Sequence, residues 1–264
     1  MTVAITRSAQ QSQCLTRKIH ELGANTVAFP VLEIAPPQDS RRIKEVLKRL
    51  GEFDIAVYIS GNAVSWALHL TRELGLKIPV KMEVAAVGAR TADALEREGL
   101  SVAICPDGQY NSEALLAMTQ MQQIAGKKII IFRGEGGREL LADTLRQRGA
   151  DVEYAEVYRR VKPNASLSQL QNREAIDLFT ISSNESLNNL YEMASDSDSR
   201  GWLLNTQLAV ISQRTVECAR KLGFKYLPLV AKVASDEGLV TTISEWYRSK
   251  HYKDRGSFEG YPYE

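Results

Sequence analysis

The clearest structural pattern of the chain lies in residues Lys127 to Arg160, KKIIIFRGEGGRELLADTLRQRGADVEYAEVYRR. It begins with a short β-branched run over residues 128–132, the pattern of a strand that is buried on both faces. A glycine-rich turn and a helix follow, and Gly149 is expected to end the helix because glycine takes positive φ without strain. The apolar stripe of this helix is predicted to comprise Leu140, Leu141, Thr144 and Leu145. With a second strand over residues 152–158, the stretch is predicted to be one strand–loop–helix–strand unit.

The turn Arg133–Arg138 is where this unit is expected to bind a ligand. Gly136 and Gly137 let the backbone approach a bound group closely, and free N–H groups at the start of the next helix favour an anion. Arg133 and Arg138 would add charge-assisted donors. The alternative is a tight turn with solvated arginines, because single glycine motifs recur by chance.

Composition limits the classes of protein to consider. The 264 residues suffice for one large or two ordinary domains, and 44% hydrophobic with 25% charged residues is typical of a globular chain. A formal net charge of +1 gives no field that would favour nucleic acid. The three cysteines have neither metal nor disulfide spacing, and neither a signal peptide nor a membrane-spanning apolar run is recognised. We therefore expect a cytoplasmic protein without membrane contact.

The same order of elements occurs twice along the chain. Three residue pairs mark the repeat, at distances of 133 − 7 = 126, 182 − 60 = 122 and 215 − 91 = 124: Arg7 with Arg133, Ser60 with Ser182, and Thr91 with Thr215. Strands that alternate with helices predict parallel sheets with crossover helices. The predicted fold class is therefore α/β, with two similar domains of parallel sheet flanked by helices and joined by a two-stranded linker.

The repeat also predicts the domain boundaries, because the two joins between the half-repeats correspond. The expected parts are residues 1–34 with 162–250 as a discontinuous first domain, 38–157 as the second, 35–37 and 158–161 as linker strands, and 251–264 as a mobile tail.

Ligands of parallel sheets bind beyond the carboxyl ends of the strands, so the turns after the strands form the candidate site. These turns are rich in Ser, Thr, Asn and Gly, and capping of the next helix is the alternative role for each of them. Asp54 and Asp177 precede strands at the opposite end and are interpreted as structural. Tyr158, at a join, is a candidate proton donor, although such a tyrosine more often packs with its hydroxyl bonded to backbone.

Several segments resemble the uroporphyrinogen-III synthase family. RGEGGRELLADTLRQRGA followed by EVYRR is similar to its central signature, and VAITRSAQQSQCLTRKIHELGANTVAFPVLEI is similar to its opening. DIAVYISGNAV and VAAVGARTADALEREGL also fit, so the resemblance covers residues 1 to about 246. The resemblance implies two similar α/β domains joined by a two-stranded ladder, which the internal repeat suggests independently.

The resemblance also implies a reaction, the cyclisation of hydroxymethylbilane to uroporphyrinogen III with loss of water and inversion of ring D. It implies neither a metal nor an organic cofactor. Catalysis is then mainly the positioning of a reactive linear tetrapyrrole. The acetate and propionate groups of that substrate suit backbone N–H groups and arginines at helix starts.

The family's functional residues map onto this chain by position. Tyr158 matches the tyrosine proposed as general acid, Thr91 and Thr215 match threonines of the family's cleft, and Ser60 and Ser182 match serines that follow strands. The expected substrate-binding residues are Arg7, Ser60, Thr91, Arg133, Gly136, Gly137, Arg138, Ser182, Arg214 and Thr215.

The second half departs from the family pattern. The family's Ile-Gly-Pro-Thr-Thr stretch appears here as residues 211–215, and a basic residue sometimes found four positions before that stretch is Gln207 here. This puts an essential lysine at that place in doubt, and Arg214 is a candidate to replace its charge. The expected partners are the linear tetrapyrrole and, transiently, the deaminase that supplies it, and a monomer is expected. The alternative function is a two-lobed cytosolic protein that binds or senses a small anion without turnover.

Overall fold

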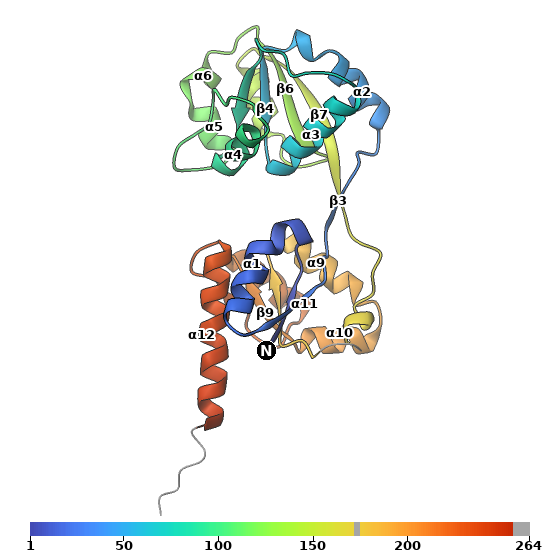
Figure 1. The fold of residues 1–264 in the computed structure, drawn as a ribbon, viewed down its shortest axis with the longest axis vertical. Helices are drawn as coiled ribbons and strands as arrows, with labels where there is room; N and C mark the ends of the chain where they lie inside the picture. The colour runs from blue at the N-terminus through green and yellow to red at the C-terminus, as the bar shows by residue number, and fades with distance from the viewer. Residues whose placement is uncertain (172–174, 256–264) are drawn as a thin grey trace, which may run out of the picture. The chain divides into compact units, whose positions relative to one another are not determined.

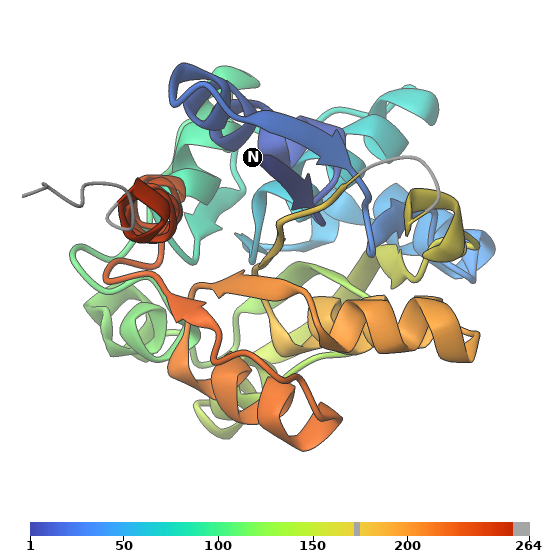
Figure 2. The same ribbon diagram turned by 90° about the horizontal axis from the view of Figure 1, so that it is seen from below.

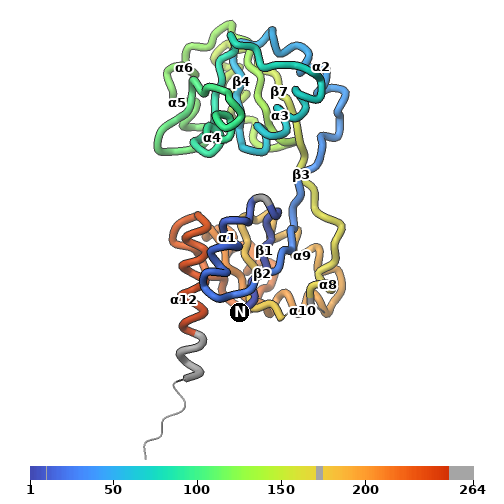
Figure 3. The backbone as a smooth tube through the Cα atoms, viewed as in Figure 1, coloured from blue at the N-terminus to red at the C-terminus, as the bar shows by residue number. Residues whose placement is uncertain are grey.

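The structure, a computed structural model, describes residues 1–171 and 175–255, with side chains described except at 10, 171 and 250–255 (Figure 1). The chain divides into two compact units, Met1–Glu33 with Lys162–Glu264 (unit 1) and Ile34–Val161 (unit 2). The backbone leaves unit 1 after its second strand and returns to it after residue 161 (Figure 3).

Unit 2 is built on a five-stranded sheet of order β3-β7-β6-β4-β5, in which β7, β6, β4 and β5 pair in parallel. The strands are β3 (Glu33–Ala35), β4 (Ile55–Tyr58), β5 (Glu83–Ala86), β6 (Lys128–Gly134) and β7 (Asp151–Val161). The helices are α2 (Ser40–Lys48), the 3-10 turn η1 (Leu50–Glu52), α3 (Gly61–Glu73), α4 (Ala89–Arg97), α5 (Ser112–Ala117), α6 (Thr119–Gln122) and α7 (Leu140–Gln147).

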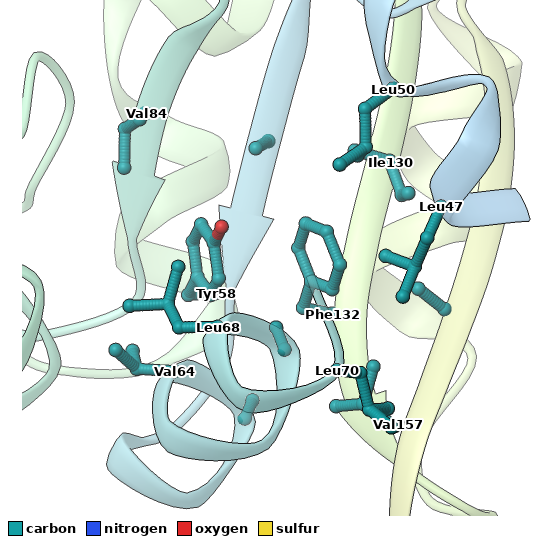
Figure 4. Close-up of a cluster of buried hydrophobic side chains, with 14 of the residues drawn as sticks. Leu47, Leu50, Tyr58, Val64, Leu68, Leu70, Val84, Ile130, Phe132 and Val157 are labelled. Carbon is teal, nitrogen blue, oxygen red and sulfur yellow. The ribbon is translucent and has the colours of Figure 1, made fainter. Parts of the chain in front are cut away.

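Successive side chains of the unit 2 strands enter two different cores, because neighbouring residues of a strand point to opposite faces. Ile130 and Phe132 of β6 pack with α2, α3 and α4, whereas Ile129 and Ile131 pack with α5, α6 and α7. Figure 4 shows the first of these clusters. Burial on both faces explains why β6 reads as a continuous apolar run. Leu140, which the sequence placed in the apolar stripe of α7, is instead 41% exposed, and α7 buries Leu141 and Leu145.

Unit 1 has a second five-stranded sheet, of order β10-β9-β8-β1-β2, and its neighbouring strands pair in parallel. Its strands are β1 (Thr2–Ile5), β2 (Asn25–Ala28), β8 (Leu178–Ile181), β9 (Gln207–Val210) and β10 (Leu229–Val230). Its helices are α1 (Ala9–Glu21), α8 (Ser168–Gln171), α9 (Asn184–Met193), α10 (Ser197–Leu204), α11 (Gln213–Leu222) and α12 (Asp236–Arg255). Helices α1 and α12 cover one face of the sheet, and α9, α10 and α11 cover the other (Figure 2).

The two units repeat one design. In unit 2 the order β7-β6-β4-β5 matches β2-β1-β8-β9 of unit 1, and an isolated parallel bridge from Ala85 to Ile104 stands where β10 stands in unit 1. Asp54 accepts a hydrogen bond from the backbone N–H of Lys128 at 2.8 Å, and Asp177 accepts the equivalent bond from Thr2 at 2.8 Å. Both aspartates therefore fix the amino ends of strands, and the prediction of an α/β fold with two parallel sheets is confirmed.

Of the predicted linker strands, residues 158–161 lie in a strand, whereas of residues 35–37 only Ala35 does. Residues 34–35 belong to β3 and residues 158–161 to β7, and these strands are neighbours in the unit 2 sheet. Helix α12 continues through residues 251–255, which the sequence assigned to the tail, and residues 256–264 lie outside the described residues. Within the described ranges, no helix is long and apolar enough to cross a membrane.

Tyr58 carries an uncompensated polar group in the core of unit 2. Its side chain is fully buried, and its ring stacks on Phe132 with centroids 4.6 Å apart (Figure 4). Its hydroxyl has no hydrogen-bond partner among the described residues, and burial raises its pKa. A buried hydroxyl without a partner costs folding free energy.

We expect Tyr58→Phe to stabilise the protein by about 1 kcal/mol or more, because it deletes that hydroxyl and keeps the ring. The measurement is the midpoint of urea unfolding. Tyr154→Phe is the matched control, because the Tyr154 hydroxyl donates to Glu139 at 2.7 Å, and its loss should lower the midpoint. A lower midpoint for Tyr58→Phe would show that the hydroxyl is satisfied after all.

Candidate active site

Each sheet has one place where the chain connections leave in opposite directions, and such a place is where α/β proteins bind ligands. In unit 2 it lies between β6 and β4, and in unit 1 between β1 and β8. In unit 2, Arg133–Arg138 span the end of β6 and the turn after it, and Ser60 follows β4; in unit 1, Arg7 follows β1 and Ser182 follows β8. The prediction that polar turns gather at the carboxyl ends of neighbouring strands therefore agrees with the topology of both sheets.

The glycine turn of unit 2 is organised by the side chain of Arg133, which is only 4% exposed. Its Nε donates to the carbonyl of Gly134 at 3.2 Å, and its Nη2 donates to the carbonyl of Gly136. A Cβ on Gly137, which has φ +112°, would lie 2.9 Å from Nη2. The turn is glycine-rich because its backbone wraps closely around a buried guanidinium.

Acidic and aromatic groups complete the surroundings of this guanidinium. Nη1 donates to Glu139 at 3.1 Å, Nε lies 3.9 Å from Glu156, and the guanidinium lies over the ring of Tyr154 at 4.4 Å. Hydrogen bonds from Tyr154 and Arg133 lower the pKa of Glu139, while burial and the bond to Glu139 raise the pKa of Tyr154 to about 12. The donors of Arg133 are directed to its own loop and to Glu156, and Arg133 also lines the pocket beside the loop, so direct substrate binding by Arg133 stays a prediction.

Beside the loop lies a pocket of about 260 Å³ that belongs wholly to unit 2. Its lining includes Arg138 and Arg160, and also Asn111 and Ser112 at the start of α5. The Arg138 side chain is 77% exposed and pairs loosely with Glu113 at 3.4 Å. An exposed ion pair of this kind is weak, so Arg138 is available to a ligand carboxylate.

Tyr158 reaches across β6 to the end of β4. The pairing of β6 with β7 shifts register after Arg133, so Gly134 stands directly opposite Tyr158. The Tyr158 ring lies on Gly134, where a Cβ would be 2.6 Å from Cε2, and its hydroxyl is 3.3 Å from Oγ of Ser60. Tyr158 is 3% exposed. The bare backbone at Gly134 therefore decides where the Tyr158 hydroxyl lies.

Ser60 and Thr91 both begin helices of unit 2. Ser60 is the N-cap of α3, and its Oγ accepts the backbone N–H of Ala63 at 3.1 Å. Thr91 lies in the first turn of α4, is buried, and donates its backbone N–H to the carbonyl of Gly88 at 2.9 Å. Capping, the alternative role for the turn residues, is thus observed for Ser60, which also meets Tyr158.

In unit 1 the predicted residues have mixed surroundings. Arg7 is paired with Asp236, the first residue of α12, at 2.5 Å, and both side chains are 19% exposed. Thr215 is fully buried with its hydroxyl 3.0 Å from Oγ of Ser212, whereas Arg214 is exposed in the first turn of α11. Of the two arginines, Arg214 is exposed to solvent, whereas Arg7 is largely buried in its ion pair with Asp236.

The structural counterpart of Ser60 is Ser183 and not Ser182. Ser183 is the N-cap of α9 with φ −163° and ψ 162°, against −164° and 161° for Ser60, and it accepts the N–H of Ser186 at 3.0 Å. A comparison of residue types aligned the serine and asparagine after β4 with those after β8 at a distance of 122. The two strands, however, end at Tyr58 and Ile181, which are 181 − 58 = 123 residues apart. Aligning strand ends would have found Ser183.

Other residues of the site carried no clear sequence signal. Glu139 and Tyr154 were not predicted, because charge pairing around a buried arginine depends on which loop folds over it. Gly134 was read as one of several turn glycines, and its special role appears only with the register shift. Among the described residues, no group of three or more His, Cys, Asp or Glu side chains is arranged to hold a metal.

We expect Gly134→Ala to destabilise the protein by about 1–3 kcal/mol through overpacking. Gly134 does not have positive φ, so alanine meets no backbone strain there, and the clash with the Tyr158 ring is the cause. Urea unfolding should show the loss in the wild-type background and no loss in a Tyr158→Ala background. An equal loss in both backgrounds would contradict the assigned contact.

Comparisons with known proteins identify the family of this chain. The family model of uroporphyrinogen-III synthase HemD matches residues 13–241. The chain is 31% identical to uroporphyrinogen-III synthase of Escherichia coli K12 over 92% of this chain and 100% of the relative, and 31% identical to that of Salmonella typhimurium LT2 with the same coverage.

Two solved structures show the same fold. A mutant uroporphyrinogen III synthase of Thermus thermophilus aligns with TM-score 0.60 and 20% identity, over 96% of this chain and 99% of that one. Uroporphyrinogen-III synthetase of Helicobacter pylori 26695 aligns with TM-score 0.60 and 14% identity, over 93% of this chain and 99% of that one. The match of the family model over most of the sequence, together with relatives of about the same length, shows that this chain belongs to the uroporphyrinogen-III synthase family.

Proposed function

We propose that this chain catalyses the cyclisation of hydroxymethylbilane to uroporphyrinogen III, with loss of water and inversion of ring D, in tetrapyrrole biosynthesis. Its membership of the family supports this proposal. The observation that carries it is the Tyr158 hydroxyl, held at the carboxyl end of the unit 2 sheet, between β6 and β4, beside Ser60. Ligands of parallel sheets bind at such a place.

Tyr158 is proposed as the general acid of the first step. Its proton passes to the leaving hydroxyl group, the bond from the hydroxymethyl carbon to oxygen breaks, and both electrons depart with the oxygen as water. The pyrrole nitrogen stabilises the cation that remains as an azafulvene. The cation attacks the substituted α-carbon of ring D and gives a spiro intermediate, and the bond from that carbon to the methylene on ring C then breaks, which leaves a second azafulvene cation on ring C. This cation closes on the free α-carbon of the inverted ring D, and the proton released there restores the Tyr158 hydroxyl, so that the net change is the loss of one water molecule.

The fate of the cation depends on how the substrate is held, because a free linear chain closes without inversion. We propose that Arg138, together with the backbone of Gly136 and Gly137, binds acetate and propionate groups at unit 2. Ser60 and Thr91 belong to the same edge of that sheet. For unit 1 we propose the same role for Ser182, Arg214 and Thr215, with Arg7 as a further candidate whose charge Asp236 already neutralises.

We propose further that the enzyme acts as a monomer in the cytoplasm, without a cofactor, and that it receives its substrate from the upstream deaminase. These proposals follow from the family resemblance and from the nature of the substrate. A linear tetrapyrrole that closes spontaneously to the wrong isomer favours rapid transfer between consecutive enzymes.

The test supplies purified protein with enzymatically generated hydroxymethylbilane, oxidises the product and separates isomers I and III. We expect isomer III from the wild type. Tyr158→Phe should lower kcat by about 100-fold, within the range for loss of a general acid, with an unchanged circular dichroism spectrum. Isomer I alone from the wild type would reject the synthase and favour an anion-binding protein, and wild-type rates from Tyr158→Phe would remove Tyr158 as proton donor.

Arg138→Ala should raise KM about fivefold to tenfold with little change in kcat, because a bond to a substrate carboxylate that persists through the reaction contributes uniform binding. Arg72→Ala is the matched control. Arg72 is also an exposed arginine of unit 2 paired with a glutamate, Glu98, but it lies outside the candidate site. Initial rates over a range of substrate concentrations separate the two parameters. An equal KM for both variants would exclude a substrate contact at Arg138.

A further inference from the structure

The hydroxyl of Ser60 makes two contacts, and only one of them is explained by helix capping. Its Oγ accepts the N–H of Ala63 at 3.1 Å, which is the capping bond of α3. The same Oγ lies 3.3 Å from the Tyr158 hydroxyl. This distance is long for two hydroxyl groups, and contacts between catalytic groups often shorten in the substrate complex.

The internal repeat shows which of the two contacts is specific to unit 2. Ser183 of unit 1 has the same backbone conformation as Ser60 and makes the same capping bond. At the repeat distance of 126, however, Tyr158 corresponds to Leu32 (158 − 126 = 32) and Gly134 to Ser8 (134 − 126 = 8). The cap is common to both units, whereas the tyrosine that meets the capping serine is present in unit 2 alone.

The number of donor and acceptor positions on the Ser60 hydroxyl then determines which oxygen donates in its contact with Tyr158 during the reaction. A serine hydroxyl has one donor and two acceptor positions, and the N–H of Ala63 occupies one acceptor position of Ser60. When Tyr158 gives its proton to the leaving group, its oxygen becomes an acceptor only. From that moment the Ser60 hydroxyl is the donor in this pair, and the capping bond holds its oxygen in place.

We propose that Ser60 is a positioning residue for the proton transfer, whose hydroxyl donates to the Tyr158 oxygen and stabilises the negative charge left there. This inference rests on the proposed role of Tyr158 as general acid. It assigns to Ser60 an action through Tyr158 in place of the direct substrate contact expected from the sequence. Hydrogen bonds to charged groups are stronger than bonds between neutral groups, so the effect falls on the step in which charge develops.

The experiment measures kcat and KM for isomer III formation in Ser60→Ala, Ser60→Thr and Ser183→Ala. Ser60→Ala should lower kcat about tenfold with KM unchanged, because the lost bond exists mainly in the transition state. Ser60→Thr keeps a capping hydroxyl and should retain most of the rate. Ser183→Ala loses the capping bond of α9 and the contact of Ser183 Oγ with Ser186 Oγ at 2.9 Å, but no contact with a tyrosine, and it should keep the wild-type rate. Ser60→Gly, which at an N-cap costs little stability, should reproduce the rate loss of Ser60→Ala if the alanine variant folds poorly.

A double-mutant cycle tests whether Ser60 acts through Tyr158. In a Tyr158→Phe background, Ser60→Ala should lower kcat by less than about twofold, since the oxygen it serves is gone. An equal loss in both backgrounds, or a raised KM with unchanged kcat, would overturn the inference in favour of a cap or a substrate contact. Tyr158→Phe with the wild-type rate would overturn both proposals, whereas a slow Tyr158→Phe beside a fully active Ser60→Ala would overturn this one alone.

An NMR measurement that does not depend on catalytic turnover completes the test. In protein labelled with 13Cζ-tyrosine, the resonance absent from Tyr158→Phe belongs to Tyr158. It should move in Ser60→Ala and stay in place in Ser183→Ala. A resonance unaffected by Ser60→Ala would show that the two hydroxyl groups do not interact, even if the enzyme makes isomer III.

Discussion

The ring of Tyr158 on the bare backbone of Gly134 is the contact on which the candidate active site depends. Strand β7 is separated from β4 by β6, so a side chain from β7 reaches the end of β4 only by crossing β6. A side chain on β6 at the crossing point would block that path, and the register shift after Arg133 places a glycine there. The position of one hydroxyl is thereby set by three strands, which hold it more firmly than a loop would.

The buried guanidinium of Arg133 gives the adjoining loop its shape. Removing a charge from water is costly, and the cost is offset here by two backbone carbonyls, two carboxylates and an aromatic face. These groups come from β6, from the loop and from β7, so their contacts tie the loop to the sheet. The loop therefore presents Arg138 and its glycine backbone from a fixed base, although Arg138 itself is exposed.

Much of the fold was predictable from sequence because it follows from local patterns. The apolar run at residues 128–132 indicated a strand buried on both faces, and the repeat of the chain indicated two sheets of the same order. Asp54 and Asp177 were interpreted correctly as structural, because their place before a strand puts them at the end away from the ligand edge.

Sequence was less informative for side chains whose environment depends on distant residues. Leu140 fits a helical stripe but falls outside the buried face of α7, because the stripe alone does not specify how the helix is rotated on the sheet. Arg133 was expected to bind an anion, yet the carboxylates that enclose it lie six and twenty-three residues further along. Ser182 and Ser183 are neighbours in the chain. Comparing residue types alone does not show which of them corresponds to Ser60, whereas aligning the ends of strands β4 and β8 does.

The position of β1 also has a consequence for biosynthesis on the ribosome. β1 lies inside its sheet, between β2 and β8, and Asp177 holds its first backbone N–H across 175 residues of chain. Unit 2 is one uninterrupted stretch that can close its sheet as soon as residue 161 has emerged. Strand β1 must instead wait, with one edge unpaired, until β8 has been translated after the whole of unit 2, and this delay leaves β1 open to wrong partners in the nascent chain.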